Sequence, residues 1–236
     1  MTSDPDRAGQ PETTSNEASP YGFTLWSVLR RPADVVAGGS ALARALGDRV
    51  AELPADIILR GVYDVSGLRA DADLMLWLHG PSAEGLQTAL RSLRRSHELA
   101  PLAPAWNALG VHRPAEVSAN HLPAFLRGDS PLAWLTVHPF AHSHEWYRLP
   151  TEERRSMLGD DGRTSHQHPT VLSSTVASFA LGDHEWLLAL EADDLVDLVD
   201  LVRRLRDTPA RRHVSEEMPL VTGRRIELDE VPEVLQ

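Results

Sequence analysis

Histidines are concentrated in one short stretch of the sequence, TVHPFAHSHEWYRLP, which covers residues 136–150. Within eight positions this stretch carries His138, His142, His144 and Glu145. Imidazole and carboxylate groups together form the ligand sets of non-haem iron and zinc sites. The pattern therefore suggests a metal centre. A polar strand end that is merely rich in histidine would have the same composition.

The apolar run LAWLTVHPF at the start of this region is typical of a β-strand. Side chains alternate between two faces along a strand. One face is expected to carry Trp134, Thr136, His138, Phe140 and His142. Histidines four positions apart can converge on one ion, so His138 and His142 are candidate metal ligands. His121 is expected to enter from a Pro-rich connector, and Asp161 or Glu145 could complete the set.

The elements that must position these residues follow a repeated order. Strand and helix patterns alternate as β-α-β-β-α over residues 21–97, and a similar order returns from residue 132. This order is typical of the ferredoxin-like β-α-β-β-α-β unit, with an antiparallel sheet and helices on one face. The sequence therefore predicts an α+β protein with two tandem ferredoxin-like units. We expect a disordered tail at 1–19, a first unit at 20–115, a second unit with the pocket at 116–226, and a C-terminal tail at 227–236.

Composition excludes several classes of protein. The chain has 236 residues and no cysteine, so disulfides, thiolate metal sites and cysteine nucleophiles are excluded. A formal net charge of −11 argues against a general nucleic-acid binder. No apolar run is long enough to span a bilayer, and the first residues lack the features of a signal peptide. A soluble cytoplasmic protein without a membrane or nucleic-acid partner is expected.

Other catalytic patterns are absent from the sequence. Ser174 and its neighbours lack the context of a nucleophile elbow, and no glycine-rich phosphate loop is present. Arginines cluster in RRLRDTPARR, residues 203–212. Such clusters can hold carboxylates or phosphates, but at helix ends they more often form solvated surfaces.

Three stretches carry a resemblance to a known family: EWYRLPTEERRSML (145–158), TVASFALGDHEWLLALEADDL (175–195) and RRHVSEEMPLVTGRR (211–225). They resemble the chlorite dismutase superfamily, and within it the actinobacterial coproheme decarboxylases. A looser match in the first half extends the resemblance to about residues 20–226. The resemblance implies a double ferredoxin-like fold, assembly into pentamers, and a haem-type cofactor pocket in the second half, on the face of the strand that carries His138.

Several functional residues of those relatives are substituted here. The resemblance implies that His138 stands at the position of a radical-forming tyrosine, and Asp161 at that of the histidine that binds the haem iron. His121 matches a distal histidine that acts as a base, and His142 replaces a basic residue. Ser174 and Trp186, on strands of the pocket half, are candidate cofactor contacts. A carboxylate such as Asp161 is a poor haem ligand compared with imidazole, so decarboxylation by the family mechanism is not expected.

The sequence thus favours a metal-dependent oxidoreductase acting on a small molecule. We expect a non-haem ion (iron, copper or zinc) held by His138 with His142, His121, Asp161 or Glu145, and His121 as the proton-transfer group. A haem- or coproheme-binding, peroxide-dependent enzyme with altered axial ligation is an alternative, in which the exposed-loop candidates His166 and His168 could supply the ligand. A catalytically inactive porphyrin-binding or partner subunit is the third possibility.

Overall fold

The computed structural model describes residues 22–32, 44–113 and 122–236. The first repeat consists of β1 (Gly22–Arg30), α1 (Leu46–Ala51), β2 (Ile58–Asp64), β3 (Leu74–Gly80), α2 (Ala83–Leu93) and β4 (Ala103–His112). The second consists of β5 (Trp134–His142), α4 (His144–Arg148), α5 (Thr151–His166), β6 (Leu172–Ala177), β7 (Trp186–Ala192), α6 (Leu195–Leu205), the 3-10 helix η1 (Pro209–His213), β8 (Val214–Glu216) and β9 (Val221–Ile226). Two short helices, α3 (Ala124–Arg127) and α7 (Val231–Val234), lie between and after them.

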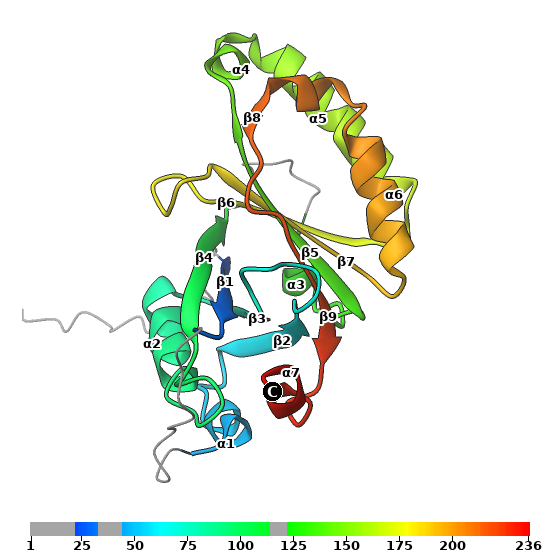
Figure 1. The fold of residues 1–236 in the computed structure, drawn as a ribbon. Coiled ribbons are helices and arrows are strands. Elements are labelled where there is room, and N and C mark those ends of the chain that lie inside the picture. The colour runs from blue at the N-terminus through cyan, green and yellow to red at the C-terminus, as the bar shows by residue number, and fades with distance from the viewer. Residues whose placement is uncertain (1–21, 33–43, 114–121) are drawn as a thin grey trace, which may run out of the picture.

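The strands form one closed antiparallel sheet. Their order is β7-β6-β4-β1-β3-β2-β9-β5-β8, and an additional β7–β5 pairing closes the ring. Within each repeat the strands follow the same order, with the fourth beside the first, then the third and the second: β4-β1-β3-β2 and β9-β5-β7-β6. This is the arrangement of two ferredoxin-like units, so the predicted fold class is confirmed (Figure 1).

The two repeats join where β4 meets β6 and where β2 meets β9. At the first junction a Cβ atom added to Gly110 would lie 2.3 Å from Cγ2 of Val176. Only glycine permits this approach of the two strands.

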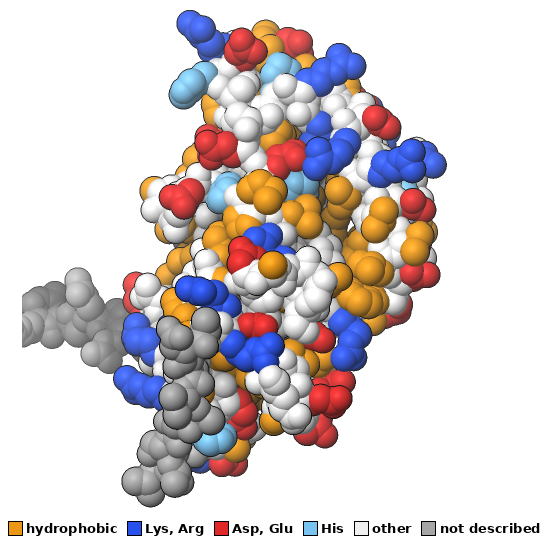
Figure 2. Space-filling model, in the orientation of Figure 1, with side chains coloured by type: hydrophobic (Ala, Val, Ile, Leu, Met, Phe, Trp, Pro, Cys, Tyr) orange, Lys and Arg blue, Asp and Glu red, His pale blue; other side chains and the backbone are white. Residues whose placement is uncertain are grey.

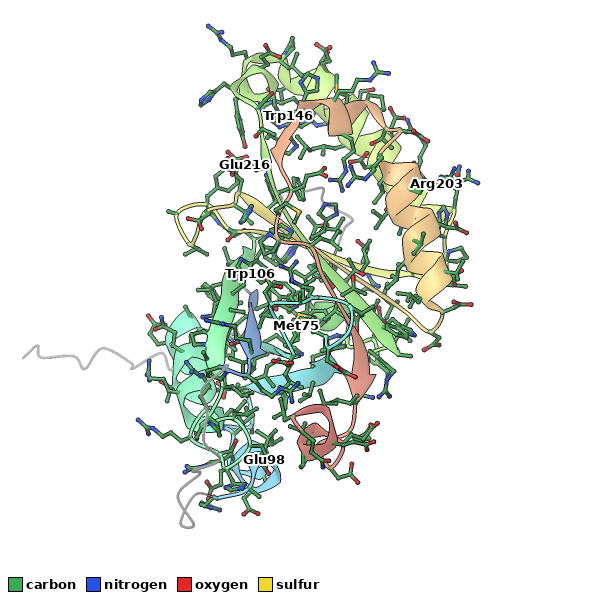
Figure 3. The ribbon with its side chains drawn as sticks, in the orientation of Figure 1. Met75, Glu98, Trp106, Trp146, Arg203 and Glu216 are labelled. Carbon is green, nitrogen blue, oxygen red and sulfur yellow. The ribbon has the colours of Figure 1, made fainter. Side chains whose placement is uncertain are left out.

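Alternating side chains divide the strands between an inner and an outer face. Inner residues of both repeats, including Trp26, Trp77 and Val137, form a central core inside the closed sheet; Figure 3 shows Met75 and Trp106 in this region. Helices α1, α2 and α7 cover the outer face of the first repeat. Helix α6 packs on the outer face of the second, and α5 lies beside it (Figure 1).

Local signals account for the helices that frame the second repeat. The Asp194 carboxylate caps α6 by accepting a hydrogen bond from the backbone N–H of Val196. Leu198, Leu201 and Leu205 recur at helical spacing and bury against β7. Ser82 caps α2 of the first repeat in the same way, by accepting a hydrogen bond from the N–H of Gly85.

Three segments differ from the sequence prediction. The Pro-rich connector contains β4, which tolerates Pro104 because the β1–β4 register shifts there. The pattern HVSEEMPLVTGRRI predicts one final strand over 213–226, but residues 217–220 divide it into β8 and β9. The C-terminal residues include α7, whose Val231 is fully buried against the first repeat. None of the helices in the described ranges is long and apolar enough to cross a membrane.

Candidate functional site

The outer face of β5 carries the histidines that the sequence singles out. Trp134 and Phe140 pack on the side of α6, whereas Leu135 and Val137 belong to the central core. Because faces alternate along the extended strand, His138 points toward the helices, as predicted. In Figure 2, histidines lie among hydrophobic side chains in the upper half of the molecule, where the second repeat is found.

His138 is buried without a hydrogen bond. It is 1% exposed, and neither Nδ1 nor Nε2 has a hydrogen-bond partner in the described structure. The Glu217 carboxylate lies beside it, with Oε2 3.7 Å from Nε2. Burial, and next the Arg211 guanidinium, lower the pKa of His138 from 6.5 to about 4. The imidazole is therefore neutral at neutral pH and keeps an unshared electron pair for a ligand or a proton.

Two arginines hold Glu217 beside this histidine. Nη1 of Arg211 lies 3.1 Å from Glu217 Oε1, and Nη2 of Arg206 lies 3.2 Å from Oε2. The Arg211 side chain is 8% exposed and its guanidinium lies 5.3 Å from the centre of the Phe140 ring. Arg206 is at the solvent edge, 61% exposed. We call His138, Glu217, Arg211 and Arg206 the β5 polar cluster.

Helix α5 lies next to the elements that carry Arg206 and Arg211. It packs against α6 and η1, yet none of its side chains is buried. Asp161 lies half-buried on this helix, and its Oδ1 has no hydrogen-bond partner. Burial raises the pKa of the Asp161 carboxyl, while Thr208 and Arg211 lower it by smaller amounts. Helix α5 thus buries none of its side chains, and His138 is buried without a hydrogen-bond partner; a bound ligand would account for both features.

His142 does not share this environment. Its ring stacks on Trp146, with centroids 4.4 Å apart and an interplanar angle of 8°, and meets the edge of Phe140. The pKa of His142 is lowered to about 4 by burial, although Glu185 opposes the shift. The prediction of His142 as a metal ligand is therefore not supported: its ring packs in an aromatic cluster at the strand end (Figure 3, Trp146).

The described residues do not assemble the predicted non-haem metal site. Among the residues that the structure describes, no three His, Cys, Asp or Glu side chains are close enough to hold an ion. Glu145 is exposed in the first turn of α4, because the strand ends before it. His121 lies outside the described residues. Of the predicted set, His138 is buried within the β5 polar cluster, and Asp161 is half-buried near Arg211 of that cluster.

The alternative histidines at the end of α5 point elsewhere. His166 is exposed, and Nδ1 of His168 lies 3.0 Å from the backbone oxygen of Thr164. Neither contacts the β5 polar cluster, so the structure gives no support to these side chains as substitute ligands.

The two predicted cofactor contacts fall on opposite faces of the sheet. Trp186 pairs with Phe140 across β5 and β7, on the outer face, and its ring contacts Phe179 edge-on. Ser174 pairs with Ala189, which belongs to the central core. Ser174 therefore lies on the inner face of β6, whereas Thr175, paired with Leu188, lies on the outer face. A cofactor contact by Ser174 stays a prediction.

Sequence reasoning missed Arg211 and Glu217. The arginine was assigned to a solvated cluster, but the turn of η1 directs it back over Phe140. The strand pattern over 213–226 predicts a continuous strand through Glu217. Pro219, which cannot donate a ladder hydrogen bond, was the available signal that the strand breaks after Glu216.

Comparison with known proteins agrees with this architecture. The chlorite dismutase family profile matches residues 40–226. A coproheme decarboxylase of Mycolicibacterium smegmatis is 48% identical over 174 residues, which cover 73% of this chain and 75% of that protein. A variant chlorite dismutase of Candidatus Nitrospira defluvii superposes with a TM-score of 0.78 at 20% identity, over 93% of this chain and 97% of that one. The imidazole complex of the same organism's chlorite dismutase gives 0.77 at 21% identity, covering 92% and 96%. The chain belongs to the chlorite dismutase family.

Proposed function

We propose that this protein binds an iron porphyrin, haem or coproheme, between α5 and the outer face of β5 and β7, and uses it in a peroxide-dependent reaction on a small molecule. The observation that carries the proposal is that His138 is buried with neither ring nitrogen hydrogen-bonded; the lack of buried side chains on α5 adds to it. The 48% identity to a coproheme decarboxylase supports the same ligand class.

The side chains around this face fit such a ligand. Phe140, Leu188 and Trp186 offer apolar surface for a flat macrocycle. Arg211 and Arg206 offer guanidinium groups for its carboxylates. When bound, the iron porphyrin supplies the redox chemistry toward peroxide.

His138 on β5 and Asp161 on α5 differ in the chemistry that they can provide to a bound porphyrin. The neutral imidazole of His138 has the chemistry of an iron ligand or a proton acceptor. Asp161 is a hard carboxylate and therefore a poorer ligand for haem iron than an imidazole; its burial raises the pKa of the carboxyl. His138 does not form the tyrosyl radical that the family resemblance associates with decarboxylation. We therefore infer a small-molecule oxidation other than decarboxylation by that route.

Absorption titration tests the proposal directly. Haem or coproheme added to the purified protein should give a saturable near-ultraviolet band at one equivalent per chain. His138→Ala should alter the band or weaken binding, whereas His166→Ala, on an exposed histidine, should leave it unchanged. Asp161→His, which places an imidazole on α5, should shift the band and tighten binding; Asp160→His, one residue earlier, is the matched control.

Two results would contradict the proposal. One is the absence of saturable binding by either porphyrin. The other is a stoichiometric ion, detected by elemental analysis of protein purified without added cofactor, in a preparation without a porphyrin band. That second result would favour a non-haem metal instead.

A further inference from the structure

Glu217 is surrounded by positive charge and an imidazole. Each of its carboxylate oxygens faces one guanidinium, Oε1 that of Arg211 at 3.1 Å and Oε2 that of Arg206 at 3.2 Å. His138 Nε2 lies 3.7 Å from Oε2. Two arginines and an imidazole around one carboxylate form a site for a carboxylate group, whichever molecule that group belongs to.

The backbone of Glu217 allows its side chain to leave. β8 ends at Glu216, which pairs with Ala141, and β9 begins at Val221, which pairs with Val137. Residues 217–220 thus lie between the two strands, outside both ladders. Rotation of Glu217 away from the arginines therefore breaks no strand pairing, and its side chain, 23% exposed, already reaches solvent.

Arg211 cannot remain without an anion. Its side chain is 8% exposed, and a buried cation that loses its partner carries a large desolvation cost. Arg206 is 61% exposed, so the site opens to solvent on that side. An incoming carboxylate can thus approach past Arg206 and take over the contact with Arg211 as Glu217 departs.

We propose that Glu217 is an intramolecular occupant of a carboxylate-binding site, and that a carboxylate of the bound ligand displaces it to reach Arg211 and Arg206. This inference rests on the proposed porphyrin binding and adds a selectivity to it. Ligands that carry a carboxylate at this edge bind by replacing Glu217, and ligands without one leave Glu217 in place. Glu217 thereby competes with every ligand that carries a carboxylate at this edge and lowers the affinity for it.

The test compares haem with its dimethyl ester, which has the same macrocycle and iron but no free carboxylate. Glu217→Gln removes the competing charge, so we expect haem to bind roughly tenfold more tightly than to the unmodified protein, a difference of about 1.4 kcal/mol. Affinity for the ester, measured in the same detergent-containing buffer, should be unchanged. Glu216→Gln is the matched control, because it removes the same charge from the adjacent exposed residue. In Figure 3 Glu216, the last residue of β8, lies on the side of that strand away from Arg203 and helix α6.

Variants of the two arginines test the carboxylate-binding site itself rather than its occupant Glu217. Arg211→Gln and the more exposed Arg206→Gln should each reduce the preference for haem over its ester, with circular dichroism confirming that the variants are folded. Equal haem affinity in Glu217→Gln and the unmodified protein would overturn the inference while leaving porphyrin binding intact. So would an equal gain for haem and ester, since it would mean a general opening of the site. Failure of every protein to bind either compound would overturn the proposed function as well.

Discussion

Arg60 of β2 and Glu191 of β7 form a buried ion pair that joins the two repeats. Nη2 of Arg60 lies 2.7 Å from Oε2 of Glu191, and the side chains are 4% and 1% exposed. Arg60 also donates to the backbone oxygen of Asp129 at 2.8 Å and lies 4.9 Å from the centre of the Trp77 ring. The pair thus links strands of different repeats inside the closed sheet.

Removing one partner of this pair should cost far more than removing both. Arg60→Met or Glu191→Leu alone leaves a buried unpaired charge, and each should lower the free energy of unfolding by about 3–5 kcal/mol. The double variant should lie closer to the unmodified protein than either single variant does. Urea denaturation of the four proteins measures the coupling; additive losses would mean that the charges are not paired.

His142 should be replaceable by another flat ring but not by a small side chain. Because its role is to stack on Trp146 at 4.4 Å, His142→Phe should preserve unfolding free energy to within about 1 kcal/mol. His142→Ala should lower it by about 2–4 kcal/mol through the cavity it leaves. Porphyrin binding should survive His142→Phe. Loss of binding in the phenylalanine variant, with stability intact, would instead show that the imidazole nitrogen is needed.

Stability should fall as the solution becomes acidic. The pKa values of His138 and His142 are about 4 in the folded protein, lowered from 6.5, so the unfolded chain takes up protons first as pH falls. Their contribution is complete above pH 6.5 and is lost on descent toward pH 4. For buried His138 the loss reaches about 3 kcal/mol. Urea denaturation between pH 7.5 and 4.5 measures it, and His142→Phe should flatten the dependence. An identical pH profile for that variant would contradict the assignment.

The strand positions were predictable because their patterns are local. Alternation in LAWLTVHPF placed His138 on the face of Trp134 and Phe140, which the structure confirms. The pattern TEERRSMLG, with its acidic first turn, predicts a helix over 151–159; the structure confirms this helix and extends it to His166, so that Asp161 lies on the helix rather than after it. These features depend on spacing along the chain, which a sequence displays directly.

Features that depend on contacts between distant segments were not predictable. Arg211 and Glu217 meet only because η1 and the break after β8 bring both against β5, and neither event is visible in periodicity. Assembly of His138, His142 and Glu145 around an ion also required the strand to continue. It ends instead, and the chain turns into α4 with Glu145 outside.

The alternation of faces along β6 gives two further predictions, because neighbouring residues of a strand point to opposite faces and only one of them can meet a ligand on the outer face. Ser174 is 1% exposed on the central side, and its Oγ has no hydrogen-bond partner. Ser174→Ala should therefore leave haem affinity unchanged and should not lower the unfolding free energy, since it removes a buried unsatisfied hydroxyl.

Thr175 should behave in the opposite way. It is half-buried on the outer face beside Leu188, toward α5 and α6. Thr175→Trp should fill space on that side and weaken haem binding at least tenfold, a change of about 1.4 kcal/mol, with little loss of stability. Ser174→Trp, by contrast, should overpack the central core and lower the unfolding free energy by about 1–3 kcal/mol. Absorption titration and urea denaturation of the two tryptophan variants separate these effects. If Ser174→Trp weakened haem binding and Thr175→Trp lowered stability instead, the ligand would lie inside the closed sheet rather than on its outer face.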